Sequence, residues 1–315
     1  MNMRLTIFLA LSLMLSFFSC QNVDSDKNSL NQNTVSKTQT LELELNKDGV
    51  KQFDIEGDVR FDLSGIVQVG EKVFVVADKV WNKSIYQIDT LKNKIKIVDE
   101  RKICVYEDID FEGIEASHNG FFIINERLSQ VYSIDFDNCF IKILPIDWSK
   151  LKLDISEWNN KGLEGVAFDP EHEILYLLKE REPRNIYAFN LKTNELYEPF
   201  TKLFNTQTDD FTDAKIEDGK LYLLERNESQ IFRIDLKTNA LDSVSFKNIF
   251  NPNKQRLYET ENPEYGTAES LLLTKNEIWV GIDNNGEKTS IYGQKLGLDK
   301  TNRPVLVVFK RPENF

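Results

Sequence analysis

The sequence predicts an all-β protein, a β-propeller of five four-stranded antiparallel blades, with a sixth blade from the two termini left open. The main observation is a pattern that recurs five times, about every fifty residues. Each copy has an opening motif, an apolar run that stops at an acid, and a further apolar run. Repeats of this length built from short strands are typical of propeller blades. The second observation is that 315 residues, 41% of them hydrophobic, suffice for a large core.

Residues 1–20 predict a targeting segment. Arg4 provides a positive charge, and residues 5–18 form an apolar stretch too short to span a membrane comfortably. Cys20 follows Ser19, and this order resembles a bacterial lipoprotein signal. We therefore expect a lipid on Cys20 that anchors the protein in the bacterial cell envelope, on the periplasmic or outer-membrane face. An ordinary secretory signal is the alternative, and the protein is exported in either case.

Residues 21–39 are almost all polar, so they cannot bury enough apolar surface to order and predict a flexible tether. Residues 40–315 are expected to form the propeller. The run 40–45 is expected to close the ring by joining the last blade, because closure removes an exposed sheet edge.

The strands of blade 1 are predicted at 65–69, 73–77, 85–89 and 94–98, separated by polar turns that favour strand ends. Blades 2, 3 and 4 repeat this arrangement. Blade 5 is less regular: 269–274 and 277–283 are predicted strands, 291–293 occupies the place of the third run, and 305–309 is the final strand.

Cys104 and Cys139 remain once Cys20 is assigned to the lipid. Both lie in runs that look like the fourth strands of consecutive blades. An oxidising compartment permits a disulfide, but two unbridged thiols fit equally well, so the pairing stays open.

Two columns of residues emerge when the repeats are aligned. The first, at the start of each innermost strand, contains Ser64, Glu112, Glu164, Thr212 and Glu269. The second, at the end of each second strand, contains Asp78, Glu126, Glu180, Glu225 and Asp283. These two strand ends lie at the same edge of an antiparallel blade, so both columns are expected to converge on one face.

Carboxylates gathered around one axis repel one another unless cations or protons compensate. A hard divalent cation with oxygen ligands, calcium above all, would provide that compensation. We therefore hypothesise a calcium site built from Glu112, Glu164 and Glu269, with Ser64 and Thr212 as neutral ligands. The alternative is a scaffold role, in which Arg127, Arg181 and Arg226 pair with the acids between blades.

Composition and missing motifs exclude several functions. The net charge of -12 argues against nucleic-acid binding, which needs basic residues to contact phosphates. No nucleophile elbow, phosphate-binding loop or dinucleotide fingerprint occurs, and the two histidines lie in polar turns. We expect a monomer.

The motifs 63–66 with 75–78, 110–114 with 125–127, 163–169 and 304–312 resemble the phytase-like family labelled "esterase-like activity of phytase". They are also similar to the SdiA-regulated propeller family. The likeness spans residues 55 to 312 or so. It implies a secreted or lipid-anchored propeller with calcium near its axis and, more loosely, activity on phosphomonoesters or other esters. Blades 4 and 5 depart from the pattern, with Thr212-Asp213 and Glu269-Ser270 in place of Glu-Gly.

Two functional hypotheses follow. In the first, calcium assists hydrolysis of a phosphorylated small molecule or another ester. Its ligand-binding residues would come from the second column and the following arginines, namely Asp78, Glu126, Arg127, Glu180, Arg181, Glu225, Arg226 and Asp283. In the second, the protein is a non-catalytic propeller that binds a ligand or an envelope protein and holds a structural cation.

Overall fold

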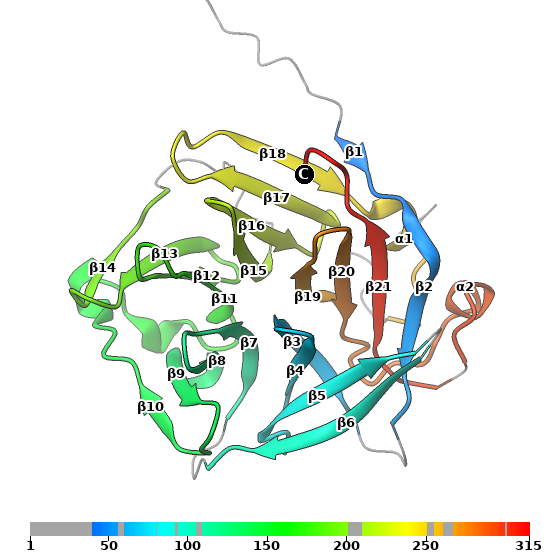
Figure 1. The fold of residues 1–315 in the computed structure, drawn as a ribbon, viewed down its shortest axis with the longest axis horizontal. Coiled ribbons are helices and arrows are strands. Elements are labelled where there is room, and N and C mark those ends of the chain that lie inside the picture. Colours follow the sequence, from blue (N-terminus) through cyan, green and yellow to red (C-terminus); the bar gives the residue numbers. More distant parts are fainter. Residues whose placement is uncertain are drawn as a thin grey trace, which may run out of the picture. The chain divides into compact units, whose positions relative to one another are not determined.

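Five four-stranded antiparallel blades surround an axis in the described part of the chain, which confirms the predicted propeller (Figure 1). Two of these blades are joined into one eight-stranded sheet by the parallel pairing of β2 with β6. The computed structural model describes residues 40–55, 60–79, 81–91, 94–104, 109–200, 210–250, 255–260, 267–299 and 301–315. The expected signal 1–20, its Cys20 and the tether 21–39 lie outside these ranges. Within them, no helix has the length and apolar character needed to cross a bilayer.

The first strand of each sheet lies nearest the axis and contacts the first strands of the neighbouring blades. Blade 1 contains β3 (Asp62–Val69), β4 (Lys72–Asp78), β5 (Ser84–Thr90) and β6 (Lys94–Lys102). Blade 2 contains β7 (Phe111–Ala116), β8 (Gly120–Asn125), β9 (Gln130–Asp135) and β10 (Ile141–Ile143). Blade 3 contains β11 (Leu163–Asp169), β12 (Ile174–Lys179), β13 (Asn185–Asn190) and β14 (Glu195–Tyr197). Blade 4 contains β15 (Phe211–Glu217), β16 (Lys220–Glu225), β17 (Gln230–Asp235) and β18 (Leu241–Ser245). Blade 5 contains β19 (Ala268–Leu273), β20 (Glu277–Ile282), β21 (Val305–Lys310) and β2 (Leu45–Phe53).

The N-terminal segment closes the ring, as predicted, but with a later part of the chain. Strand β2 pairs antiparallel with β21 as the outer strand of blade 5, and Gln52 and Phe53 also pair in parallel with β6 of blade 1. The earlier β1 (Leu41–Glu42) pairs in parallel with β18 of blade 4 instead. Both segments bury side chains: Phe53 packs in the core between blades 5 and 1, and Leu43 is buried against Val244 and Phe246 of blade 4.

The third run predicted for blade 5 is wrong. Residues 291–293 begin the short helix α2 (Ile291–Lys295), and β21 takes the third place in the sheet. The Ser290 side chain accepts the amide of Gly293 and so caps the helix. Ile291 is 73% exposed, whereas five of the six residues of β21 are buried.

The core lies between the blades rather than inside one of them. Leu224 and Val244 of blade 4, for example, pack in one cluster with Leu271, Val280 and Val307 of blade 5. Both faces of the sheets are thereby buried, which accounts for the apolar runs that the sequence shows in every repeat.

The remaining helices are short and lie between strands. They are η1 (Glu126–Leu128), η2 (Trp148–Leu151), η3 (Ile155–Glu157) and α1 (Lys247–Phe250). Of these, η2 and η3 lie in the connection from blade 2 to blade 3, and α1 lies in the connection from blade 4 to blade 5.

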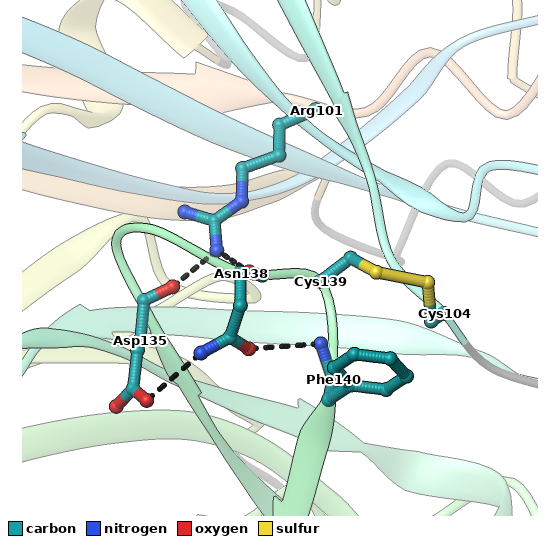
Figure 2. The surroundings of a disulfide bond; sticks show 6 residues. All are labelled: Arg101, Cys104, Asp135, Asn138, Cys139 and Phe140. Atoms are coloured by element: carbon teal, nitrogen blue, oxygen red, sulfur yellow. Dashed lines mark hydrogen bonds between the residues drawn. A yellow bond between two sulfur atoms is a disulfide. The ribbon is translucent and has the colours of Figure 1, made fainter.

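A disulfide joins Cys104 to Cys139, which answers the question that the sequence left open (Figure 2). Cys104 follows β6 and Cys139 precedes β10, so the bond links the outer edges of blades 1 and 2. The Cys104 amide also donates to the Cys139 carbonyl at 2.8 Å, and the Arg101 guanidinium donates to the carbonyls of Asp135 and Asn138.

Candidate metal centre

The first predicted column occupies an irregular position in all five innermost strands. Pairing with the second strand of the blade skips residues near the strand start. The skipped residues are Ser64, Glu112 with Gly113, Glu164, Thr212 and Glu269. A β-bulge takes its extra residue out of the regular pleat and redirects the side chain. The bulges therefore place this column at one end of the axis.

Glycine after the bulge lets the innermost strands approach one another closely. A Cβ on Gly113 would lie 2.6 Å from the carbonyl oxygen of Glu164, and one on Gly65 would lie 2.8 Å from that of Glu112. Neither distance is compatible with a side chain. Blades 1, 2 and 3 consequently pack tightly at the axis, which brings Glu112 and Glu164 to neighbouring positions.

Blade 4 has Asp213 where the earlier blades have glycine, and this departure builds the floor of the site. Asp213 Oδ2 accepts the Leu271 amide of blade 5 at 2.7 Å, and Oδ1 accepts Lys215 Nζ at 3.1 Å. Lys215 Nζ also lies 3.6 Å from Glu115 Oε2 of blade 2. Burial raises the pKa of Asp213 to about 7 despite Lys215. An ion-paired cluster therefore fills the axis below the acidic column.

Above this floor lies a cavity of about 170 Å³ at the acidic end of the axis. Its wall carries eight carboxyl groups but two cationic side chains, Lys79 and Arg226. The carboxyl groups belong to Asp78, Asp110, Glu112, Glu126, Glu164, Glu180, Glu269 and Asp283. Ser64, Asn160 and Asn285 complete the lining. Eight of the ten residues in the two predicted columns thus meet in one cavity.

Thr212 and Glu225 are the two column residues that do not line the cavity. The Thr212 hydroxyl donates to the Ala268 carbonyl at 2.9 Å and so bridges blades 4 and 5. Glu225 accepts the backbone amides of Asn227 and Glu228 at 3.1 and 2.8 Å, which closes its own turn. Both side chains therefore make hydrogen bonds that stabilise the fold.

The three predicted arginines take different places. Arg127 is exposed in η1 and does not line the cavity. Arg181 lies outside the cavity wall, where it pairs with Glu180 and donates to the Asn160 carbonyl at 3.1 Å. Arg226 is buried in the wall itself.

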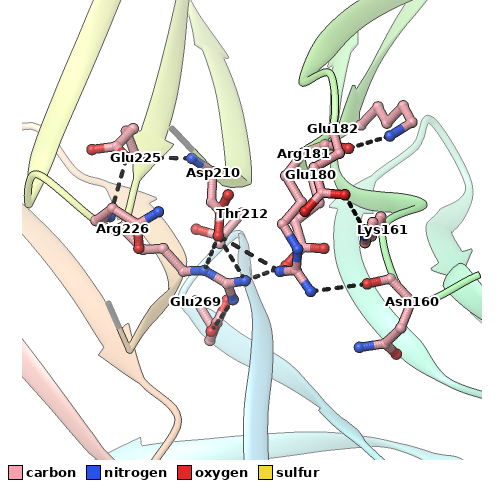
Figure 3. A network of polar contacts seen from close by, with 12 residues as sticks. Asn160, Lys161, Glu180, Arg181, Glu182, Asp210, Thr212, Glu225, Arg226 and Glu269 are labelled. Carbon is pink, nitrogen blue, oxygen red and sulfur yellow. Dashed lines mark hydrogen bonds and ion pairs between the residues drawn. The ribbon is translucent and has the colours of Figure 1, made fainter. Parts of the chain in front are cut away.

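Arg226 neutralises one side of the carboxyl ring (Figure 3). Its Nη1 lies 2.6 Å from Glu269 Oε1 and its Nε lies 3.1 Å from Asp210 Oδ2. Its Nη2 donates to Glu180 Oε1. One guanidinium thus connects carboxyl groups of blades 3, 4 and 5, in the manner expected of the scaffold alternative. Burial nevertheless raises the pKa of Glu269 to about 7.

The side of the ring formed by blades 2 and 3 lacks such compensation. Within the described residues, the carboxyl groups of Glu112 and Glu164 make no hydrogen bond or ion pair. Glu164 is only 7% exposed. Burial and then the neighbouring carboxylates raise the pKa of both groups well above its usual range. Burial also raises the pKa of Glu126 to about 7, although its Oε1 accepts the Gly162 amide at 2.8 Å.

A third part of the wall comes from blades 1 and 5. Lys79 Nζ pairs with Asp78 and lies 3.3 Å from Asp62 Oδ2. Asp283 Oδ1 accepts the Asn285 amide at 2.8 Å, and burial, followed by the charge of Asp62, raises the pKa of Asp283 well above its usual range. Lys79 therefore neutralises the blade 1 acids, as Arg226 neutralises the opposite side.

Two sets of carboxyl groups in the wall, one containing Glu112 and the other Glu164, have the spacing of ligands to a hard cation. One oxygen from each of Glu126, Glu164 and Glu180 lies within 4.8 Å of the others, and the same holds for Asp78, Asp110 and Glu112. Carboxylate oxygens at such spacing are the donors that calcium prefers. The buried Glu164 carboxyl, aimed into the cavity without a basic partner, is the observation that favours a cation over a purely internal network.

Sequence reasoning did not identify Asn160 and Asn285 as parts of the cavity wall. Asn160 follows η3 in the connection from blade 2 to blade 3, and Asn285 follows β20. Asn160 lies in a long connection outside the aligned motifs. Asn285 lies two residues after the column acid Asp283, where the other blades have no common residue type, so the alignment carried no signal for either.

A family model described as SdiA-regulated matches residues 71–262, more than half of the chain. The chain belongs to the SdiA-regulated family. The match runs from the second strand of blade 1 through blade 4 and includes the acids of the cavity from Asp78 to Glu180. Membership of the SdiA-regulated family confirms one of the two resemblances in the motifs, and the phytase-like resemblance stays a prediction.

Solved structures share the fold of this SdiA-regulated family member at low sequence identity. The glutaminyl cyclase of Myxococcus xanthus is 9% identical, with a TM-score of 0.53 over 87% of this chain and 100% of that chain. A luciferin-regenerating enzyme is 13% identical, with a TM-score of 0.47 over 80% of each chain. A gluconolactonase from Xanthomonas campestris is 10% identical, with a TM-score of 0.44 over 79% of this chain and 72% of that chain. The first of these supports the propeller fold.

Proposed function

We propose that this member of the SdiA-regulated family is an exported hydrolase that binds calcium in its axial cavity and cleaves small esters there. The observation that carries the proposal is the position of Glu164 beside Glu112. Both carboxyl groups line the cavity, and in the described part of the chain neither makes a hydrogen bond or an ion pair. The charge of Lys79 acts on Glu112 but is outweighed by burial and by the neighbouring carboxylates, which raise the pKa of Glu112. An ionised carboxylate buried without a partner costs several kcal/mol, and a bound cation removes that cost.

Glu112 and Glu164 would hold the ion, with Glu126 and Asp110 beside them. Calcium takes about six to eight oxygen ligands, so backbone carbonyls and water would complete the set. Glu269 is left out because Arg226 already holds it. Thr212 is left out because its hydroxyl bonds to Ala268. Ser64 accepts the Asp78 amide at 3.0 Å and is left at the rim of the site.

The residues of the chain itself support ester chemistry at this place. Bound calcium would polarise a carbonyl or phosphoryl oxygen. The carboxyl group of Glu126, with its pKa raised to about 7 by burial, exchanges a proton near neutral pH and suits a general base. The Gly162 amide fixes its Oε1, which leaves Oε2 to take the proton.

The charge of the wall favours an uncharged substrate. Eight carboxyl groups face two cationic side chains, so a single divalent ion leaves the cavity negative. A phosphomonoester dianion is repelled by such a wall, whereas a neutral carboxylic ester or lactone is not. We therefore place neutral esters ahead of phosphomonoesters as substrates.

A second candidate function is a non-catalytic propeller that binds a ligand or an envelope protein and keeps a structural cation. It is favoured by the chemistry of the wall, which contains neither histidine nor cysteine among the described lining residues. The one hydroxyl there, Ser64 Oγ, donates to the Asp62 carbonyl at 3.3 Å rather than to a base.

Hydrolysis assays with and without calcium distinguish the hydrolase from the non-catalytic propeller. The substrates are p-nitrophenyl acetate, gluconolactone and p-nitrophenyl phosphate, and the variants are Glu112→Gln/Glu164→Gln and Glu157→Gln. Glu157 is an exposed acid outside the cavity wall and serves as the matched control. We expect calcium-dependent turnover of an uncharged substrate that only the double variant loses. No turnover, with calcium still raising the melting temperature of the wild type, would instead support the structural cation.

Export and lipid anchoring through Cys20 are part of the proposal. The disulfide between Cys104 and Cys139 supports them, because cytosolic thiols are kept reduced. Fractionation of cells that express the wild type or Cys20→Ser tests the anchor. The wild type is expected with the membranes and the variant in the soluble envelope fraction; equal distribution of both would contradict it.

A further inference from the structure

We propose that Arg226 is a built-in cation that occupies one side of the axial carboxyl ring and limits the cavity to a single calcium ion. The inference rests on the proposed cation site and assigns Arg226 the role of setting how many ions that site holds.

The position of Arg226 is fixed by its surroundings. The side chain is 5% exposed, and its amide donates to the Asp210 carbonyl at 3.2 Å. The preceding residue, Glu225, accepts the amides of Asn227 and Glu228 and so fixes the turn that carries the arginine. The guanidinium is therefore held in place by the backbone as well as by the carboxyl groups.

The guanidinium takes the place that a metal ion would otherwise fill. It contacts Glu180, Asp210 and Glu269, which come from three successive blades (Figure 3). Three carboxyl groups around one point form the same kind of oxygen donor set as the opposite side of the ring offers. Arginine remains charged at all relevant pH values, so its compensation is permanent, whereas a calcium ion exchanges.

The boundary between the two sides lies at Glu180. Its carboxyl group contacts Arg226 and also lies within 4.8 Å of ligand oxygens of Glu126 and Glu164. Removal of the guanidinium would leave Glu180, Asp210 and Glu269 facing one another. Arg181, which pairs with Glu180 and lies 3.6 Å from Asp210 Oδ2, would remain as one positive charge against three carboxylates. We expect this side to recruit a second calcium ion, because one arginine leaves it with an excess of negative charge.

Calcium stoichiometry of the full chain, measured by equilibrium dialysis, tests the inference. The ion held by Glu112 and Glu164 is counted as the difference between the wild type and Glu112→Gln/Glu164→Gln, and the additional ion is counted as the difference in total bound calcium between Arg226→Met and the wild type. The test variant is Arg226→Met. Arg181→Met is the matched control, since Arg181 belongs to the same network but lies outside the cavity wall. Arg226→Lys keeps the charge, and circular dichroism checks the fold of each variant.

The inference predicts one cavity ion for the wild type, for Arg181→Met and for Arg226→Lys, and one additional ion for Arg226→Met. A folded Arg226→Met protein that binds no additional ion overturns it. If Glu112→Gln/Glu164→Gln binds two fewer ions than the wild type, the inference is also overturned, even if Arg226→Met fails to fold. If the double variant binds as many ions as the wild type, the proposed cation site itself is wrong. This result differs from failure of the inference about Arg226 alone.

Discussion

The Glu164 carboxyl group lies close enough to Glu112 for the Glu112 charge to raise its pKa, and within the described residues neither group makes a hydrogen bond or an ion pair. Their bulged positions and the close approach at Gly113 hold them there. On the opposite side of the same ring, Arg226 forms ion pairs with the carboxyl groups. This asymmetry divides the ring into a part that stabilises the fold and a part that is available to a cation.

Glu164→Gln is expected to stabilise the protein in chelator at pH 8, because it removes a buried charge that lacks a partner. We expect a gain of about 1–3 kcal/mol, or about 2–4 °C in Tm for each kcal/mol. The variant should also lose most of the calcium-induced rise in Tm. Thermal unfolding with and without calcium measures both effects, with Glu157→Gln as the control. A lower Tm in chelator would show that the Glu164 charge is compensated by the protein.

Stability in chelator is expected to fall as pH rises from about 4.5 to about 7. Glu126 and Glu269 have an ordinary pKa of 4.5 and a folded pKa raised by burial to about 7. In this window the unfolded chain releases protons that the folded chain retains, so each increase in pH favours unfolding. The loss is complete above the folded pKa.

Saturating calcium should oppose this trend, because the ion binds the deprotonated carboxyl groups of Glu112 and Glu164 and its charge favours the ionised form of Glu126 beside them. The rise in Tm that calcium causes is therefore expected to be small at pH 5 and large at pH 8. Melting curves across this range provide the measurement. Parallel pH profiles with and without calcium would mean that the ion does not bind these carboxyl groups.

Cys104→Ser/Cys139→Ser is expected to destabilise the protein by roughly 3–4 kcal/mol. The disulfide closes a segment with a sequence separation of 35, and a loop of this length restricts the unfolded chain by about that amount. Urea unfolding of the variant gives the value, with Cys20→Ser as the control. Unchanged stability would mean that the backbone hydrogen bond from the Cys104 amide to the Cys139 carbonyl suffices to join blades 1 and 2.

Gly113→Ala is expected to cost a few kcal/mol, roughly as much as other overpacking changes, and to weaken calcium binding. The new Cβ would lie 2.6 Å from the Glu164 carbonyl and push the innermost strands of blades 2 and 3 apart. Gly162→Ala is the milder comparison, since its Cβ would meet the flexible Glu126 side chain at 3.2 Å. Similar stability of the two variants, measured in urea, would contradict this account.

The sequence predicted the convergence of the two columns because repeat length and antiparallel strand ends determine it. It did not predict which acids would be compensated. Which acids are neutralised depends on where the Arg226 side chain runs between three blades. Arg127 and Arg181 occupy the same position in their repeats as Arg226, so the sequence does not distinguish the three. The role of Asp213 was equally hidden, since its bond to the Leu271 amide exists only once blades 4 and 5 are packed.

Errors in the fold prediction arose where one copy of the repeat differs from the rest. Residues 291–293 match the sequence pattern of the third strand in the other blades, but the Ser290 cap starts a helix there. The closing strand lies at Leu45–Phe53 rather than 40–45, because the segment around Leu43 pairs with β18 of blade 4 instead: Leu43 is buried there and its amide donates to the Ser245 carbonyl at 2.7 Å.

A crystal structure of the protein grown with calcium, with anomalous scattering data, tests the central claim most directly. The account predicts an anomalous peak in the axial cavity with carboxylate oxygens of Glu112 and Glu164 at about 2.3–2.6 Å. A cavity without such a peak, in which a basic side chain reaches Glu112 and Glu164 instead, would contradict it.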